Sequence, residues 1–145
     1  MKKQINRALA LIIAGIILGA SQPASAQTAD RAVVNVPFAF TAGERQLPAG
    51  RYTVRRVKLD SEAAILIRSE DGGASATVLT NAARGDSGKA RLTFRQYGDA
   101  YFLAGVYVPG AAVGREVAES RSERGARRGR AKAGGEATVV AVNAR

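Results

Sequence analysis

Hydrophobic and polar residues alternate along much of the chain that follows residue 30. The first such segment, RAVVNVPFAF at 31–40, has valine or phenylalanine at every second position from Val34 to Phe40. A period of two with β-branched and aromatic residues predicts a β-strand with one apolar face. Pro37 has no N–H to donate to a neighbouring strand, so we expect this strand to lie at a sheet edge or to carry a bulge.

The next segment, GERQLPAGRYTVRR at 43–56, predicts a corner between two strands. Pro48 supplies the fixed φ that the second position of a tight turn prefers, and Gly50 tolerates the backbone angles of the exit. Tyr52 and Val54 then resume the alternation on one face. Local turn chemistry accounts for this pattern. Further strands are predicted at 63–69, 74–82 and 136–142.

The segment ARLTFRQYGDAYFLAGVYV at 90–108 predicts a hairpin that turns at Gly98 and Asp99. In this register Phe94 faces Leu103 and Gln96 faces Tyr101, so both strands place large apolar residues on the same face. Arg95 then points to solvent. The residues predicted to share the core face are Leu92, Phe94, Tyr101, Leu103 and Tyr107.

Taken together, these segments predict an all-β domain, an antiparallel β-sandwich or a small open barrel of about six or seven strands. Residues 111–135 form a basic, Gly/Ala-rich excursion before the last strand. Ser120 and Glu123 have the spacing of a capping box, in which each side chain accepts the other's backbone N–H, so a helix is expected over 121–130. Gly125 and Gly129 each weaken it by roughly 1 kcal/mol relative to alanine, which leaves a loose linker as the alternative.

The N-terminus has the organisation of a signal peptide. Lys2, Lys3 and Arg7 precede the apolar run 8–20, and the small-residue triplet 24–26 follows. The run is shorter than the roughly 20 residues that a bilayer-spanning helix needs, which argues against the alternative of a retained anchor. We therefore expect a signal peptide at 1–26 and a single β-rich domain at 27–145. The product would be exported, either periplasmic or secreted, with no transmembrane segment after signal removal.

The composition of the chain excludes several types of catalytic and metal-binding site. The chain has no cysteine, histidine or tryptophan, and Met1 is its single methionine. Serine–histidine and cysteine–histidine nucleophiles, the usual zinc ligand sets and disulfide exchange are therefore excluded. We expect a non-catalytic binding or structural module of the envelope or exterior, not an enzyme, and no cofactor. A hydrolase based on carboxylates or tyrosine is the remaining catalytic alternative, and it would need two acids to converge in a cleft.

Net charge points to an anionic partner. The formal charge is +10, and removal of the three basic residues of the signal peptide leaves 19 basic against 12 acidic residues, or +7. An anionic envelope polymer, a lipid surface or another envelope protein would suit this charge. Nucleic acid is disfavoured because the basic segment 115–132 contains no aromatic residue that could stack on bases. The candidate anion-binding residues are Arg51, Arg55, Arg56, Arg95, Arg124, Arg127, Arg128 and Arg130.

An alternative function uses the strand arginines of that set. A concave cluster of them beside an aromatic wall would make a specific binding protein for acidic glycans or phosphate-bearing lipids. The opposite interpretation is a solvated strand whose charges discourage edge-to-edge pairing.

Two acidic clusters and one adhesion-like tetrapeptide carry less information. Asp60 with Glu62 and Glu70 with Asp71 lie at opposite ends of the predicted strand 63–69, so they cannot form one catalytic pair. Neither cluster has the spacing of an EF-hand. The residues RGDS at 84–87 spell an integrin-binding motif, but they also make a good Gly-rich turn, which is the interpretation we favour.

A resemblance to known proteins rests on the segment 36–54, VPFAFTAGERQLPAGRYTV. It resembles the N-terminal signature of a group of small, uncharacterised exported bacterial proteins, in which a Pro-Phe strand precedes Leu-Pro-Ala-Gly, a variable residue and Tyr. The shorter piece LPAGRYTV at 47–54 is similar to a corner of transthyretin-like carboxypeptidase regulatory domains, which are β-sandwiches. The resemblance implies a β-rich fold and export, and it implies no catalytic residue at these positions.

Overall fold

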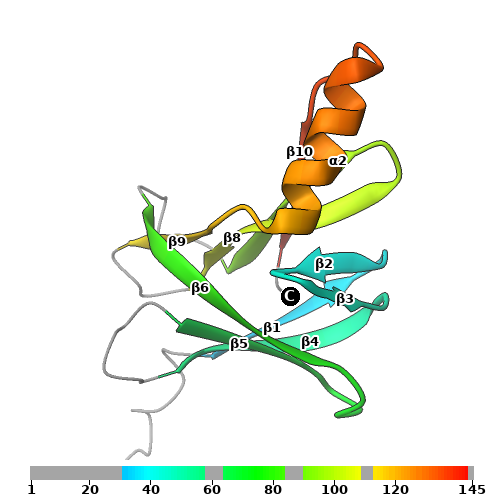
Figure 1. Cartoon of the computed structure of the whole chain (residues 1–145). Helices are drawn as coiled ribbons and strands as arrows, with labels where there is room; N and C mark the ends of the chain where they lie inside the picture. The colour runs from blue at the N-terminus through cyan, green and yellow to red at the C-terminus, as the bar shows by residue number, and fades with distance from the viewer. Residues whose placement is uncertain (1–30, 58–63, 84–89, 109–112, 144–145) are drawn as a thin grey trace, which may run out of the picture.

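The computed structural model describes residues 31–57, 64–83, 90–108 and 113–143. These residues form ten strands and one helix (Figure 1). The strands are β1 (Arg31–Val36), β2 (Phe40–Ala42), β3 (Arg45–Leu47), β4 (Gly50–Val57), β5 (Ala64–Ser69), β6 (Ser75–Ala83), β7 (Arg91–Tyr97), β8 (Ala100–Tyr107), β9 (Gly114–Val117) and β10 (Thr138–Asn143), and the helix is α2 (Arg121–Lys132). The signal peptide, the Asp60–Glu62 cluster and the RGDS segment lie outside the described residues.

The strands form one curved, mixed sheet that does not close. Hydrogen-bonded neighbours follow the order β1-β4-β5-β6-β9-β8-β7-β10, and the short pair β2–β3 joins β8 through a parallel contact at Thr41 and Phe102. The terminal strands β1 and β10 lie close to each other without pairing. The prediction of an all-β fold, sandwich or open barrel, is confirmed. The strand number is higher than predicted because the short strands β2, β3 and β9 were not anticipated.

The first strand, β1, ends at Val36, just before Pro37. Pro37 separates β1, which pairs with β4, from β2, which pairs with β3 and β8. β1 is the end strand of the pairing order, so the prediction of an edge position is confirmed. The predicted alternation persists across the break, because Val34, Val36 and Phe40 are all buried.

The 43–56 segment is a corner that ends in the centre of the core. Gly43 adopts φ +62° between β2 and β3, a conformation that favours glycine. Tyr52 is fully buried, its hydroxyl donates to the carbonyl oxygen of Pro48 at 2.6 Å, and its ring meets Phe40 edge-to-face at a centroid distance of 5.2 Å. Phe40 contacts Phe94 in the same way at 5.2 Å, so the corner is tied to the β7–β8 hairpin.

The hairpin has the predicted register at its turn. Phe94 lies opposite Leu103, and Gln96 opposite Tyr101. A β-bulge between Thr93 and Phe94 then shifts the pairing, so that Leu92 faces Val106. Since one extra residue exchanges the two faces of a strand, Val106 belongs to the core. The prediction that Tyr107 shares the core face is therefore wrong: its ring lies beneath the Arg91 guanidinium, 4.2 Å from the ring centroid.

In the described part of the chain, no helix is both long and apolar enough to cross a membrane. The one described helix, α2, contains no aliphatic residue larger than alanine and no aromatic residue. It lies beside β10 and extends beyond the rest of the sheet (Figure 1). Its packing against the sheet consequently depends on polar contacts.

Candidate functional site

Helix α2 begins at a polar anchor that two parts of the chain build. Ser120 is the N-cap, and its hydroxyl accepts the backbone N–H of Glu123 at 3.1 Å. Glu44, in the β2–β3 turn, accepts the N–H of Arg121 at 2.6 Å and that of Ser122 at 3.4 Å. The first N–H groups of a helix have no intrahelical acceptor, so these contacts satisfy three of them. The Arg121 N–H lowers the pKa of Glu44 by stabilising its carboxylate.

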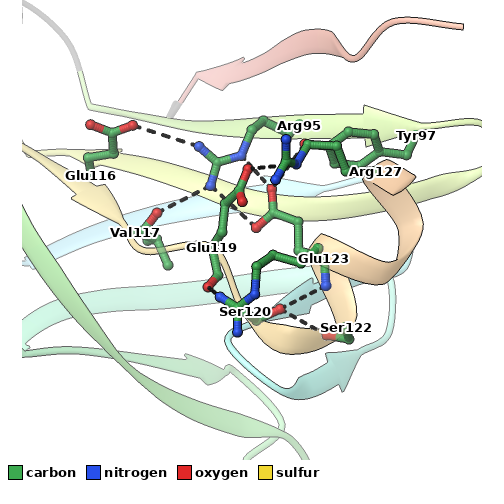
Figure 2. A network of polar contacts seen from close by, with 10 residues as sticks. Arg95, Tyr97, Glu116, Val117, Glu119, Ser120, Ser122, Glu123 and Arg127 are labelled. Atoms are coloured by element: carbon green, nitrogen blue, oxygen red, sulfur yellow. Dashed lines mark hydrogen bonds and ion pairs between the residues drawn. The ribbon is translucent and has the colours of Figure 1, made fainter. Parts of the chain in front are cut away.

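The Glu123 side chain points toward the sheet instead of the capping-box position (Figure 2). Its side chain is 2% exposed, and its carboxylate accepts from Arg95 Nε at 2.5 Å and Nη2 at 3.3 Å. Arg95 also donates to the carbonyl oxygen of Val117 at 3.2 Å and lies 3.7 Å from the Glu116 carboxylate. The helix is thus held against β7 by a buried ion pair.

Tyr97 lies beside this ion pair and adds a hydrogen bond to Glu123. Tyr97 donates from its hydroxyl to Glu123 at 3.5 Å, and its ring packs edge-to-face on Phe102 at 5.8 Å. Burial, followed by the negative charge of Glu123, raises the pKa of Tyr97. Burial alone would lower the pKa of Arg95, but the hydrogen bond and charge of Glu123 raise it above its ordinary value. Both groups therefore keep their neutral-pH charge states, tyrosine neutral and arginine cationic.

This network corrects the prediction for Arg95. The sequence pattern placed Arg95 in solvent with the other candidate anion-binding arginines, but its side chain is 18% exposed and its guanidinium binds Glu123. Alternation predicts that the face opposite the core is solvated, but α2 covers this face at the hairpin. The predicted helix exists and runs two residues further than expected, to Lys132, which excludes the linker alternative.

The outward side of α2 carries a line of positive charges. At 100° per residue, Arg121, Arg124, Arg128 and Lys132 fall on one side of the helix, while Glu123 and Ala126 fall on the other. All four cations are exposed. No acidic side chain lies within ion-pair distance of them among the described residues. We call these four residues the α2 stripe.

The predicted helix arginines divide between this stripe and the rest of the helix. Arg124 and Arg128 belong to the α2 stripe, and Arg124 also donates to the Glu119 carbonyl oxygen at 2.7 Å. Arg127 lies on the flank, 3.4 Å from the Glu119 carboxylate. Arg130 points to the opposite side and lies over Gly135, where a larger residue would meet its guanidinium. The structure adds Arg121 and Lys132, which the helical spacing alone could have indicated.

The strand arginines divide between the two faces of β4. Arg51 and Arg55 lie on the outer face, away from the core, and Arg51 is 3.5 Å from the Glu70 carboxylate. Arg56 is half-buried on the core-facing side. The four strand arginines of the candidate set therefore do not lie together: Arg56 is on the other face of β4, and Arg95 is on β7.

A different cluster forms on the outer face of β1, β4 and β5. It lines an open depression of about 500 Å³, which we call the outer groove. Arg31 lies opposite Arg55, and Thr53 lies opposite Arg68, so one arginine comes from each of three adjacent strands. Among the described residues that line it, none is aromatic. The lining residues are Arg31, Thr53, Arg55, Leu66, Arg68, Ser69, Glu70, Asp71 and Gly72.

The acids at the end of the outer groove are engaged in local contacts. Asp71 accepts from the Ser69 hydroxyl at 2.5 Å and from the Gly73 N–H at 2.9 Å, and these donors lower the pKa of Asp71. Glu70 faces Arg51. This is the geometry of a β-turn, which the hydrogen bond from the Gly72 N–H to the Ser69 carbonyl oxygen closes at 3.0 Å. Among the described residues, no three acidic side chains come together as they would to hold a metal ion.

Comparison of the chain with models of protein families, with curated proteins and with solved structures finds no match in any of the three. The resemblance of 36–54 to exported bacterial proteins and to transthyretin-like domains stays a prediction.

Proposed function

We propose that this protein is an exported, non-catalytic binding module that attaches to a polyanion of the cell envelope through the α2 stripe. The observation that carries this proposal is the alignment of four exposed cations on one side of a helix whose opposite side is fixed to the sheet. Export rests on the signal-peptide pattern of 1–26.

The anchor gives the stripe a defined geometry. Arg121 and Lys132 are eleven residues apart, so the charges span about 16 Å at the rise of an α-helix. A linear array of that length suits a polymer that carries regularly spaced anionic groups. Because Glu44 and Arg95 hold the helix, less side-chain and backbone freedom is lost on binding than a disordered basic tail would lose.

The composition of α2 favours a hydrophilic polyanion over a membrane interior. Helices that insert into a lipid interface carry large apolar residues on one face, and α2 has none. Binding should therefore be electrostatic and should fall as salt shortens the screening length from about 10 Å at 0.1 M to 3 Å at 1 M.

The proposal is tested with the chain from Gln27 to Arg145 on an immobilised polyanion such as poly(glycerol phosphate). We expect retention at 0.1 M salt and release near 1 M. Replacing all four stripe residues by glutamine should remove the retention. The thermal midpoint should barely change, because exposed charges contribute little to folding. Retention that this replacement does not reduce would refute the role of α2.

A further inference from the structure

The outer groove has a charge arrangement that folding alone does not favour. Arg31 and Arg55 lie directly opposite each other on paired strands, where like charges are destabilising. Arg68 is a third cation on the next strand. In the part of the chain that the structure describes, none of the three has an acidic side chain within ion-pair distance. Glu70, which also lines the groove, is 3.5 Å from Arg51 instead.

A hydroxyl group lies at the centre of this triad. Thr53 Oγ1 accepts from Arg31 Nη2 at 3.3 Å, and Thr53 is the register partner of Arg68. Arg55 is two residues further along the same strand, so it shares the outer face with Thr53. Since the oxygen of Thr53 accepts from Arg31, its O–H hydrogen stays available for a ligand oxygen.

We propose that the outer groove binds a phosphate group, with Arg31, Arg55 and Arg68 as charge partners and the Thr53 hydroxyl as an additional donor. Guanidinium groups bind phosphate oxygens in pairs of parallel hydrogen bonds, and three of them arriving from different strands suit a tetrahedral anion better than a planar carboxylate. The ligand also relieves the repulsion between Arg31 and Arg55.

The shape of the groove indicates how the phosphate is carried. The groove is open, so the group can be part of a larger molecule. Leu66, the register partner of Arg55, supplies an apolar surface next to the charges for the carbon atoms of a phosphate ester. Glycerol phosphate units occur both in polymers and in lipid headgroups, so the ligand class is a phosphate ester of a small polyol.

The first test is an NMR titration of the Gln27–Arg145 chain with inorganic phosphate and with glycerol 3-phosphate at constant ionic strength. The side-chain Nε–H signals of Arg31, Arg55 and Arg68 and the amide of Thr53 should shift with one common dissociation constant. Acetate at the same ionic strength should bind much more weakly. Equal binding of acetate, or shifts that do not saturate together, would overturn the proposal.

Matched variants separate the site from general positive charge. Arg55→Gln and Arg68→Gln should each weaken phosphate binding by about tenfold or more, since each removes a charge-assisted contact. Thr53→Val keeps the side-chain shape and should weaken it several-fold. Arg51→Gln, on the same face of β4 but paired with Glu70, is the control and should change it by less than about twofold. A control that weakens binding as much as Arg55→Gln would overturn the assignment.

Thermal stability provides a second readout, because Arg55→Gln should weaken phosphate binding but stabilise the ligand-free protein. In phosphate-free buffer of low ionic strength, Arg55→Gln should raise the thermal midpoint by roughly 1 to 5 °C, because a like-charge pair is removed. Phosphate should raise the thermal midpoint of the original protein more than that of the variant at every phosphate concentration. A midpoint that falls in Arg55→Gln without ligand would contradict the idea that Arg31 and Arg55 repel.

The carrier of the phosphate is identified with two probes, vesicles that contain phosphatidic acid and soluble poly(glycerol phosphate). The carrier whose binding is weakened by Arg55→Gln and Arg68→Gln is the one the groove recognises, and an effect on neither would overturn a role for the groove in recognition. This inference is independent of the α2 stripe. The four-residue α2 variant should keep the full phosphate titration even where polyanion retention is lost, so the two proposals fail separately.

Discussion

The ion pair between Arg95 and Glu123 should determine whether α2 stays on the sheet. Replacing Arg95 by alanine would leave the Glu123 carboxylate, 2% exposed, without the guanidinium that lies 2.5 Å away. Removal of one partner from a buried ion pair costs about 3–5 kcal/mol. Arg95 is 18% exposed and Tyr97 keeps a hydrogen bond to Glu123, so we expect the lower part of that range, about 3 kcal/mol.

The assay combines denaturant unfolding with amide hydrogen exchange. Arg95→Ala should shift the unfolding midpoint and should also deprotect the amides of α2 more than those of β4 and β5, because the helix can leave the sheet before the sheet unfolds. Arg91→Ala is the control on the same strand. It loses a surface cation–π contact with Tyr107 and should cost less than about 1 kcal/mol.

A combined variant tests whether the cost arises from an unpaired charge. Arg95→Met together with Glu123→Leu removes both charges and should recover most of the stability that Arg95→Ala loses. The reasoning is refuted if Arg95→Ala costs no more than Arg91→Ala and the exchange of α2 amides is unchanged.

Three further predictions concern the core, the helix and its anchor. Phe94→Ala and Leu103→Ala should each cost roughly 2 to 5 kcal/mol in denaturant unfolding, since both are buried; a cost below 1 kcal/mol would contradict the register. Gly129→Ala should stabilise α2 by up to about 1 kcal/mol because its site is open, whereas Gly134→Ala, at φ +74°, should destabilise it; the reverse order would contradict the helix end. The folded-state pKa of Glu44 is lowered, so its anchoring contribution is complete above its ordinary value of 4.5 and is lost as pH falls through the folded value. The protection factors of the amides at the start of α2, which correct for the pH dependence of intrinsic exchange, should therefore fall on acidification, and Glu44→Gln should remove this component.

Alternation predicted most of the sheet because burial acts locally on strands. The faces of β1 and β4, the hairpin turn and the pairing of Phe94 with Leu103 all follow from period-two burial and turn chemistry. The bulge that moves Tyr107 off the core face breaks the alternation, and Gly105 is the residue of the pattern that could have indicated it. The bulge depends on which residues the neighbouring strands place next to Gly105, where a side chain would collide with Thr93.

The candidate site was less predictable because it is assembled across strands. Arg55 and Arg31 are far apart in the sequence, and the pairing of β1 with β4 brings them together. The helix itself was indicated by Ser120 and Glu123, yet the destination of the Glu123 carboxylate depends on β7. Contacts between the helix and the sheet therefore give Glu123, predicted as a capping residue, the role of an anchor. Its partner is Arg95, which was predicted to lie at the surface.

The central claim, attachment through the α2 stripe, is tested most directly by comparing two double variants that lose the same charge. Arg124→Gln with Arg128→Gln removes half of the stripe, and Arg45→Gln with Arg51→Gln removes two exposed arginines of the sheet. Retention on poly(glycerol phosphate) is measured as the salt concentration that elutes each protein. The account predicts a clearly lower eluting salt for the helix variant and a nearly unchanged one for the sheet variant. Equal reductions would show that net charge alone drives retention and would contradict the account.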